Sequence, residues 1–311
     1  MVVYVVNRVR KQVGCTDDIQ RDIVTQDLAV AVLDTGIGAH PDFNGRIVEF
    51  ADFVNNRQGC YDDSGHGTHV AGCVGGSGYA SHGVYKGMAP ACRLCIGKVL
   101  DQNGEGSIDS MHRGIVWVMQ NRLRHRIRVL NVSLGIGTSG ERERMKELVD
   151  LLDAVWDQGI VVVCAAGNNG PKEGTISPLG SSRRVITVGC HEGGYFGARR
   201  DLCENYSGRG SRAMMYRKPD VVAPGTDIVS CNLQFLGNQR SGYRNAYIRK
   251  SGTSMSTPIV SGAAALFLQK YPDAGNAEVK RRMIYSARDM GDSWSKQGWG
   301  MINLEEMCSS G

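Results

Sequence analysis

The stretch LAVAVLDTGIG (28–38) combines a continuous apolar run with an acidic residue, Asp34, at its end. An apolar run without polar alternation is typical of a strand that is covered on both faces, as in a parallel sheet. Burying a carboxylate costs free energy unless it is paired or hydrogen bonded, so Asp34 needs a partner from elsewhere in the chain. Taken alone, Asp34 is equally well explained as a turn-forming aspartate.

Further apolar runs alternate with segments of helical periodicity along the chain. Strands are predicted over 28–34, 93–100, 127–134, 159–166, 185–189 and 227–230, and helices over 107–121 and 141–158. This alternation predicts an α/β fold in which helices cover both faces of a mostly parallel central sheet. Two polar, glycine-rich stretches, 196–222 and 231–250, are expected to be loops within the same domain.

The composition indicates one large folded domain. The chain has 311 residues, of which 41% are hydrophobic, and no linker-like stretch divides it. We assign residues 28–311 to this domain and residues 1–27 to an N-terminal extension. The net charge of +5 is too small a bias to indicate a nucleic-acid partner. No apolar stretch reaches the roughly 18–20 residues of a transmembrane helix, so no membrane partner is expected.

Basic residues cluster once, where Arg122, Arg124, Arg126 and Arg128 surround His125. One interpretation is a docking patch for a partner. The other, which we favour, is a solvated helix end, where cations interact well with the negative end of the helix dipole.

Ten cysteines occur in a chain whose N-terminus, MVVYVVNRVR, does not resemble a secretory signal. They are therefore expected to be reduced thiols in a cytoplasmic protein, although non-classical release would place it outside the cell. Cys92 and Cys95 form a CxxC pair, but CRLCIGKVL is typical of a strand, where residues three apart point to opposite faces. A redox or zinc role for this pair is the disfavoured interpretation.

The string DDSGHGTHVAG (62–72) places a histidine between two glycines at the start of a predicted helix. Gly65 and Gly67 leave room around His66, which makes it a better candidate for a catalytic base than His69. A metal-binding pair of His66 and His69 is the alternative. The sequence lacks the glutamate that stands between the two histidines of the zinc-protease motif.

The string SGTSMSTPIVSGAAAL (251–266) places Ser254 at the start of a helix of small residues. Backbone N–H groups and the positive end of the helix dipole at such a position favour a developing oxyanion. Taken alone, Ser254 is either a nucleophile or a helix cap.

Together, in the order Asp, His, Ser, these strings resemble the subtilisin-like serine peptidases, the subtilases, for which this chain order is established. The resemblance extends from about Leu28 to Asn303. The strings HPDFNGRIVEFADFVN, YDDSGHGTHVAG and VITVG, in this order, are most similar to the intracellular and AprX-like bacterial branch. The resemblance implies a three-layer subtilisin-like fold. It also implies a serine endopeptidase that cleaves extended peptide or protein substrates through an acyl-enzyme.

The resemblance assigns a role to each matched residue. Ser254 corresponds to the nucleophile, His66 to the base and Asp34 to the carboxylate that orients the imidazole. Asn168 corresponds to the side-chain oxyanion donor, with the backbone N–H of Ser254 as its companion and Thr253 as a support. A peptide-binding pseudoprotease, which keeps the groove without cleaving, is the alternative function.

The resemblance further implies a groove in which an extended peptide lies as an added strand between two backbone segments. Ile136 stands where the family often has a second glycine, and it is expected to narrow or reshape this groove. The first segment comprises Gly104, Glu105, Gly106 and Ser107, and the second comprises Ser133, Leu134 and Gly135. The wall of the first side-chain pocket includes the second segment together with Ala165, Ala166 and Gly167.

The predicted chemistry requires no cofactor, and calcium is the open question. Asp42 matches a carboxylate that serves a calcium site in many secreted subtilisins. The companion stretch GGSGYASHGVYK (75–86) departs from the family's loop pattern, so modest or no calcium dependence is expected.

Three smaller features complete the expectations. Asp62 and Asp63 either attract a basic substrate residue or form a solvated acidic turn. Ser177-Pro178 aligns with a segment that often carries a cis peptide bond in the family. Residues 1–27 are too few for the folded propeptide of secreted members, which leaves a short flap over the groove as a weak hypothesis. The sequence does not indicate an oligomeric state.

Overall fold

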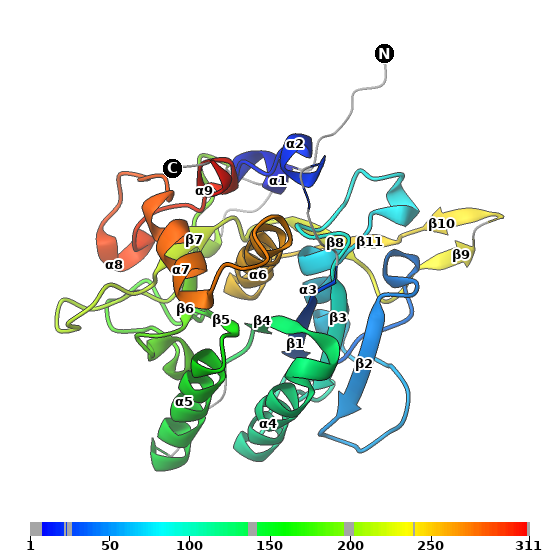
Figure 1. Ribbon diagram of the computed structural model, residues 1–311, viewed down its shortest axis with the longest axis horizontal. Helices are drawn as coiled ribbons and strands as arrows, with labels where there is room; N and C mark the ends of the chain where they lie inside the picture. Colours follow the sequence, from blue (N-terminus) through cyan, green and yellow to red (C-terminus); the bar gives the residue numbers. More distant parts are fainter. Residues whose placement is uncertain are drawn as a thin grey trace.

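A parallel sheet of seven strands, in the order β2-β3-β1-β4-β5-β6-β7, lies at the centre of the described part of the molecule (Figure 1). The structure is a computed structural model that describes residues 8–21, 23, 27–135, 142–195, 202–238 and 240–309. All neighbouring strands of this sheet pair in parallel. The strands are β1 (Ala29–Asp34), β2 (Ile47–Asp52), β3 (Arg93–Lys98), β4 (Ile127–Val132), β5 (Val161–Ala165), β6 (Ile186–Cys190) and β7 (Val221–Ala223).

Two helices precede these strands, and the others connect the strands or follow the last of them. They are α1 (Arg8–Gln12), α2 (Asp17–Arg21), α3 (His66–Gly75), α4 (Ile108–His125), α5 (Arg142–Asp157), α6 (Thr253–Lys270), α7 (Asn276–Tyr285), α8 (Trp294–Gln297) and α9 (Leu304–Cys308). Four short 3-10 helices are η1 (Pro41–Phe43), η2 (Tyr79–Ser81), η3 (Pro178–Ser181) and η4 (Cys203–Asn205).

Alternate residues of β1 face two different hydrophobic cores, which explains why the strand is apolar throughout. Val30 and Val32 pack into the core that also holds buried residues of α3, α6 and α7. Ala31 and Leu33 pack into the core formed with α4 and α5. Figure 1 shows α4 and α5 together on one side of the sheet. The predicted three-layer α/β fold, with helices on both faces, is therefore confirmed.

Each of the six predicted strands and both predicted helices is present, with bounds that differ by a few residues. The sequence interpretation missed β2, which lies at the edge of the sheet and is mostly half-buried, so its residues mix apolar and acidic side chains. It also missed β7, a strand of three residues inside the stretch 196–222 that was predicted to be a loop.

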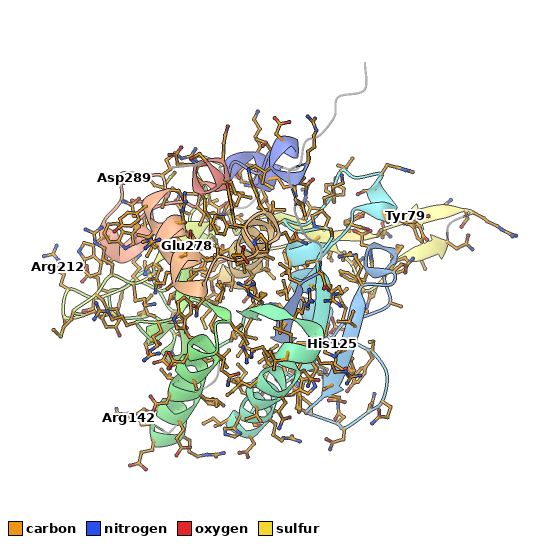
Figure 2. The ribbon with its side chains drawn as sticks, viewed as in Figure 1. Tyr79, His125, Arg142, Arg212, Glu278 and Asp289 are labelled. Carbon is orange, nitrogen blue, oxygen red and sulfur yellow. A yellow bond between two sulfur atoms is a disulfide. The ribbon has the colours of Figure 1, made fainter. Side chains whose placement is uncertain are left out.

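Two antiparallel ribbons correct the loop prediction for 231–250. Strand β8 (Ile228–Cys231) pairs with β11 (Tyr247–Lys250), and β9 (Leu236–Asn238) pairs with β10 (Gly242–Arg244). The β9–β10 ribbon projects from the body of the molecule (Figure 1). Its strand residues are exposed except for the half-buried Tyr243, and Leu236 is their one aliphatic side chain, so no apolar periodicity reveals it. Ring contacts of Tyr243 with Phe235 and Tyr79 hold its base, and Tyr79 is seen beside it in Figure 2.

The described part of the N-terminal extension packs on the domain. Val9 and Val13 are buried in the core with α3 and α6. The Arg10 guanidinium donates to the carbonyl oxygens of Gly87 and Met88, and the N–H of Leu304 donates to the carbonyl of Val13. None of these contacts involves a residue of the predicted groove, and residues 1–7 lie outside the described part. The flap over the groove therefore remains a prediction without a supporting contact.

Within the described residues, no helix combines the length and apolar character that crossing a bilayer requires. The favoured interpretation of the basic cluster as a solvated helix end is only partly right. Arg122 and Arg128 donate to the carbonyl oxygens of Gln158, Pro272 and Ala274, so these cations tie surface segments together. His125, at the end of α4 (Figure 2), lies 2.9 Å from a carboxylate oxygen of Glu49.

Candidate active site

Several predicted site residues lie on segments at the C-terminal edge of the parallel sheet. Because β3, β1, β4 and β5 are successive neighbours, the segments that follow their C-terminal ends lie side by side. These segments are 104–107 after β3, Asp34 at the end of β1, 133–135 after β4 and 165–168 at and after the end of β5. The carboxyl ends of parallel strands are the usual place for ligand sites in α/β folds.

Asp34 and His66 are in direct contact at this edge. Nδ1 of His66 lies 2.6 Å from Oδ1 of Asp34, and the same oxygen accepts the N–H of Thr35 at 2.8 Å. The Asp34 side chain is fully buried, whereas a quarter of the His66 side chain is exposed. Burial lowers the pKa of His66, but the charge of Asp34 and its hydrogen bond outweigh burial, so this pKa lies above the ordinary value of 6.5.

Asp62 holds the loop after β1 against the start of α3. Its carboxylate accepts the hydroxyl of Thr35 at 2.8 Å, and it also accepts N–H groups of Ser64, Gly65 and Thr68. The hydroxyl of Thr68 donates to it at 2.6 Å. Burial raises the pKa of Asp62, but the bonds from Thr68, Gly65 and Ser64 lower it overall. The sequence did not indicate this role, because Asp62 stands three residues before the N-cap Gly65 and its partner Thr35 is 27 positions away.

A glycine is required where α3 approaches this loop. The N–H of Gly67 donates to the hydroxyl oxygen of Thr35 at 2.8 Å. A Cβ atom at Gly67 would lie only 2.2 Å from the carbonyl oxygen of Gly36, so no side chain fits there. The Gly-His-Gly pattern therefore brings His66 to Asp34 through close backbone packing.

The carboxylates of Asp62 and Asp63 are both bonded to groups of the protein, although Asp62 is buried and Asp63 is exposed. Asp63 forms an ion pair of 2.6 Å with the buried Lys98, whose ammonium group also donates to the carbonyl oxygens of Thr35 and Leu100. Together with the five hydrogen bonds to Asp62, this pairing argues against the expected attraction of a basic substrate residue. A solvated acidic turn is also wrong for Asp62, which is buried.

Asn168 and Thr253 are in contact at the start of α6. Oδ1 of Asn168 accepts the N–H of Thr253 at 3.2 Å and its hydroxyl at 2.9 Å. These bonds turn the amide nitrogen of Asn168 away from Thr253. A Cβ atom built on Gly252 would lie 3.7 Å from this nitrogen and 3.8 Å from the backbone nitrogen of Ser254, so both donors border the same space. Ser254 is half-buried in the first turn of α6.

Comparison with known proteins identifies the family. The model of the subtilase family matches residues 25–300. The chain belongs to the subtilase family. It is 38% identical over 292 residues to Serine protease AprX of Bacillus subtilis (strain 168), which covers 89% of this chain and 65% of that protein. It is 36% identical over 282 residues to Subtilisin DY of Bacillus licheniformis, which covers 90% of each chain.

A third relative, Subtilisin Savinase of Lederbergia lenta, is 33% identical to this chain over 285 residues. The match covers 92% of this chain and 92% of that protein. The predicted resemblance to subtilases and to AprX is therefore confirmed. The chain spans just under two thirds of the length of AprX. Membership of this family, whose relatives named here are proteases, makes the chain a peptide-bond hydrolase by class.

The predicted groove segments of this subtilase are held by their neighbours. Ser107 caps α4 by accepting the N–H of Ser110 at 3.0 Å. Ser133 and Leu134 are buried and Gly135 is exposed, while Ile136 lies outside the described residues. Hydrogen bonds also fix the wall at 165–167, where the Ser177 hydroxyl donates to the Ala165 carbonyl and the Gly208 N–H donates to the Gly167 carbonyl.

The expected cis bond at Ser177-Pro178 is wrong. Among the described residues, the cis peptide bonds are Gly170-Pro171 and Lys218-Pro219. A single sequence does not reveal which proline is cis, because the preference of each X-Pro bond depends on its tertiary surroundings.

The alternative metal and redox interpretations of the motifs receive no support from the subtilase structure. Nε2 of His69 lies 2.9 Å from the carbonyl oxygen of Ile228 in β8, away from His66, so the two histidines do not converge on a common ligand position. Burial lowers the pKa of His69 to about 3. Cys92 and Cys95 are buried in different hydrophobic cores, which agrees with the prediction that they point to opposite faces. Burial raises the pKa of their thiols to about 11 and about 12.

Asp42 is surrounded by hydrogen-bond donors. Its carboxylate accepts N–H groups of Gly78 at 2.8 Å and Ala80 at 3.1 Å, and the hydroxyl of Tyr247 at 3.0 Å. Nδ1 of His40 lies 3.7 Å from it. Calcium requires six to eight oxygen ligands. These surroundings supply donors in place of oxygen ligands, so they do not fit calcium at Asp42.

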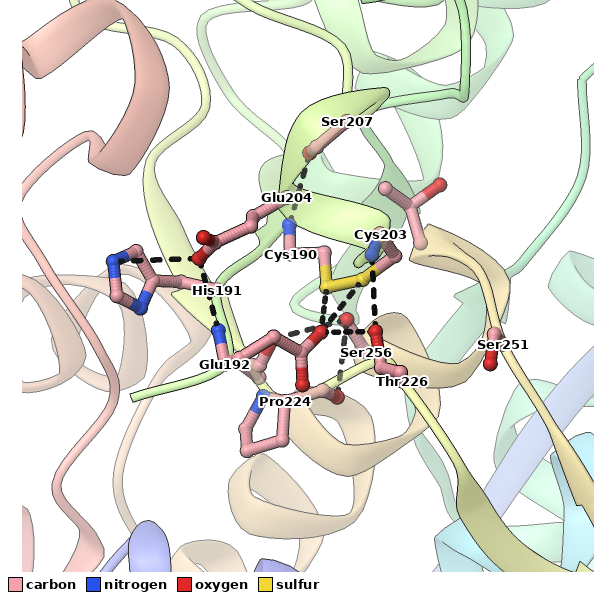
Figure 3. Close-up of a disulfide and its surroundings, with 12 residues drawn as sticks. Cys190, His191, Glu192, Cys203, Glu204, Ser207, Pro224, Thr226, Ser251 and Ser256 are labelled. Carbon is pink, nitrogen blue, oxygen red and sulfur yellow. Dashed lines mark hydrogen bonds and ion pairs between the residues drawn. A yellow bond between two sulfur atoms is a disulfide. The ribbon is translucent and has the colours of Figure 1, made fainter. Parts of the chain in front are cut away.

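The expectation that all ten cysteines are reduced is wrong for one pair. Cys190 and Cys203 form a disulfide (Figure 3). The two residues are 13 positions apart, and no motif joins them. They meet because the end of β6 and the helix η4 are neighbours in the fold, which the sequence alone does not reveal.

Proposed function

We propose that this subtilase is a serine endopeptidase that forms an acyl-enzyme on Ser254. His66 acts as the base and Asp34 as the carboxylate that orients and stabilises the imidazolium. The observation that carries this proposal is the contact of 2.6 Å between Asp34 and His66. With Nδ1–H donated to Asp34, Nε2 is the free acceptor for the Ser254 proton and later returns it to the leaving amine.

The oxyanion of the tetrahedral intermediate is stabilised by two donors. These are Nδ2 of Asn168 and the backbone N–H of Ser254, which border the same space beside Gly252. Thr253 orients Asn168 because it donates twice to Oδ1. Donors that are already in position need no reorganisation when the negative charge develops.

The substrate is an extended peptide or protein segment bound between 104–107 and 133–135. These segments follow β3 and β4, which are the two neighbours of β1 in the sheet. A substrate strand between them passes over the end of β1, where Asp34 lies. Main-chain hydrogen bonds of this kind are indifferent to side chains, so the pocket bordered by 165–167 contributes the specificity.

Cleavage of unfolded casein tests the proposed function, with products mapped by mass spectrometry. We expect internal cuts with the wild-type protein and about 10⁶-fold slower turnover for Ser254→Ala and His66→Ala. Retention of full activity in Ser254→Ala contradicts the proposal. Binding of peptide without any cleavage by the wild type identifies a pseudoprotease instead.

A cytoplasmic location remains a prediction from the cysteine content, and the Cys190–Cys203 disulfide argues against it. Fractionation of producing cells, with the chain detected by antibody in cytoplasm and medium, tests it directly. The proposed chemistry requires no cofactor.

A further inference from the structure

The Cys190–Cys203 disulfide joins the end of β6 to η4, and Figure 3 shows it with its surroundings. Cys190 ends β6, and Cys203 begins η4. Both side chains are fully buried. A Cβ atom at Gly225 would lie 2.7 and 2.8 Å from the two sulfur atoms, so the backbone of Gly225 packs directly on the bond.

A buried carboxylate faces both sulfur atoms. Oε1 of Glu192 lies 3.1 Å from Sγ of Cys190 and 3.2 Å from Sγ of Cys203, as Figure 3 shows. Glu192 is almost fully buried, and the hydroxyl of Thr226 donates to the same oxygen. Within the described part of the chain, Oε2 has no hydrogen-bond donor, and Nη1 of Arg8 is 3.9 Å from it.

This arrangement favours two thiols over a disulfide. The sulfur atoms of a disulfide carry no hydrogen, so they cannot donate to Glu192, whereas two thiols can both donate to Oε1. A buried carboxylate without sufficient donors carries a cost in free energy. In agreement, burial raises the pKa of Glu192 more than Thr226 and Arg8 lower it. Reduction therefore adds two donors to Oε1, which otherwise accepts only the Thr226 hydroxyl among the contacts of the described residues, and so stabilises the buried carboxylate.

The disulfide is linked to the loop that carries Asn168. The backbone N–H of Cys190 donates to the hydroxyl oxygen of Ser207 at 2.9 Å. Beyond η4, the carbonyl of Tyr206 accepts the N–H of Gly170 at 2.9 Å, and the N–H of Gly208 donates to the carbonyl of Gly167 at 2.7 Å. The segment that begins at Cys203 thus supports both sides of Asn168.

The same disulfide is linked to the helix that carries Ser254. The N–H of Cys203 donates to the hydroxyl of Thr226 at 2.9 Å. The residue before Thr226 is Gly225, and its carbonyl accepts the N–H of Gly252 at 2.9 Å. The hydroxyl of Ser256 donates to the carbonyl of Ala223 at 3.0 Å. The pair therefore joins the supports of the two proposed oxyanion donors.

We propose that Cys190 and Cys203 form a thiol–disulfide exchange site whose reaction partner is a dithiol reductant. Glu192 shifts the equilibrium of this site towards the dithiol. The disulfide form is the more active peptidase. The activity part of this proposal rests on the proposed function. The equilibrium part does not.

Because the bond is buried, exchange requires a local opening of the segment that carries Cys203. A thiolate of the reductant then attacks one sulfur, breaks the Cys190–Cys203 bond and forms a mixed disulfide. The second thiol of the reductant then attacks the reductant sulfur of this mixed disulfide. The protein sulfur is released, and the reductant leaves as a cyclic disulfide. The reductant loses two electrons and two protons. The protein gains both as two thiols, whose hydrogens are donated to Oε1 of Glu192.

The equilibrium is tested on the full chain in buffers of reduced and oxidised dithiothreitol. Incubation from both directions continues until the two agree, and free thiols are then trapped and located by mass spectrometry. In Glu192→Gln, we expect half-reduction of the protein at a ratio of reduced to oxidised dithiothreitol about tenfold higher than in the wild type. This ratio corresponds to a reduction potential lower by about 30 mV for two electrons. Glu204→Gln, a nearby carboxylate that does not face the sulfurs, is the control and is expected to shift the ratio less than threefold. Equal ratios for wild type and Glu192→Gln overturn the proposal.

The activity part compares the oxidised and reduced wild type on one peptide substrate. We expect kcat to fall about fivefold on reduction, with KM changed less than twofold, because the oxyanion supports loosen while the groove is retained. Cys190→Ser/Cys203→Ser is expected to match the reduced enzyme and to ignore dithiothreitol, whereas Cys308→Ser keeps the wild-type response. Unchanged kcat on full reduction overturns the activity part. Inactivity of both forms with the equilibrium shift intact instead indicates that the proposed function is wrong.

Discussion

The hydroxyl of Thr35 donates to the buried carboxylate of Asp62 at 2.8 Å and accepts the N–H of Gly67 at the same distance. One side chain thereby joins the residue after Asp34 to the residue after His66. The contact between Asp34 and His66 thus depends on residues that do not react themselves. This arrangement gives the proposed triad a rigid base before any substrate binds.

Removing the Thr35 hydroxyl is expected to lower activity through this positioning. Thr35→Val leaves a buried donor and acceptor unpaired, and we expect kcat/KM to fall about tenfold, which corresponds to about 1.4 kcal/mol. Thr35→Ser keeps the hydroxyl and is the matched control, expected within threefold of the wild type. Steady-state assays of both variants provide the measurement. Equal losses for the two variants contradict a role for the hydroxyl.

The pH dependence of activity follows from the raised pKa of His66. The base must be neutral to accept the Ser254 proton, so kcat/KM is expected to fall on the acid side with a midpoint above 6.5. Lys250→Met removes a cation that lowers the pKa of His66 and should move this midpoint to higher pH. Lys146→Met, on the exposed face of α5, is the control without an effect. A midpoint that moves to lower pH in Lys250→Met contradicts the assignment.

The same pKa has a consequence of opposite sign for stability. Because the pKa of His66 is higher in the folded than in the unfolded protein, its contribution to stability is fully present below about pH 6.5. It is lost as the pH rises through the folded-state pKa. Denaturant unfolding of the inactive Ser254→Ala protein between pH 5 and 9, against Ser254→Ala/His66→Gln, measures this contribution. If the difference in unfolding free energy between the two proteins increases with pH, the assignment is contradicted.

Loss of the Asn168 donor is expected to affect the chemical step. For Asn168→Ala we expect kcat to fall about 10²–10³-fold with little change in KM, a magnitude taken from the corresponding donor in subtilisin, a member of this family. Thr253→Val, which removes one of the two bonds to Oδ1, is expected to lose about tenfold. Single-turnover assays separate this effect from binding. A loss confined to KM is the contrary result.

Calcium removal is expected to have little effect at Asp42, because protein donors already engage this carboxylate. A chelator should change the Tm by less than about 2 °C, whereas Asp42→Asn should lower it by about 5 °C with or without calcium. Thermal unfolding of Ser254→Ala proteins, which avoids self-cleavage, measures both. A large drop in Tm on chelation that added calcium restores overturns this expectation.

The sequence allowed prediction of those elements whose burial is visible as an apolar run. Strands β1, β4 and β5 are covered on both faces, so their composition alone reveals them. Strand β2 lies at the sheet edge and the β9–β10 ribbon is exposed, so packing leaves little trace in their residues. For strands, an apolar run is therefore most informative where burial is nearly complete.

The candidate site divides in the same way. Asp34, His66 and Ser254 stand in strings specific enough to be assigned before the structure. The role of Asp62 depends on contacts with Thr35, 27 positions away, and the pairing of Cys190 with Cys203 depends on the meeting of β6 and η4. Such long-range contacts follow from topology, which spacing along one sequence does not encode.

Labelling with a fluorophosphonate probe tests the central claim, an activated Ser254, most directly. The folded wild type and Ser254→Ala are exposed to the probe, and the modified residue is located by peptide mass spectrometry. We predict one modified residue, Ser254. Labelling should be abolished in Ser254→Ala and strongly slowed in His66→Ala. Absence of labelling in the folded wild type, or labelling that persists in Ser254→Ala, contradicts it.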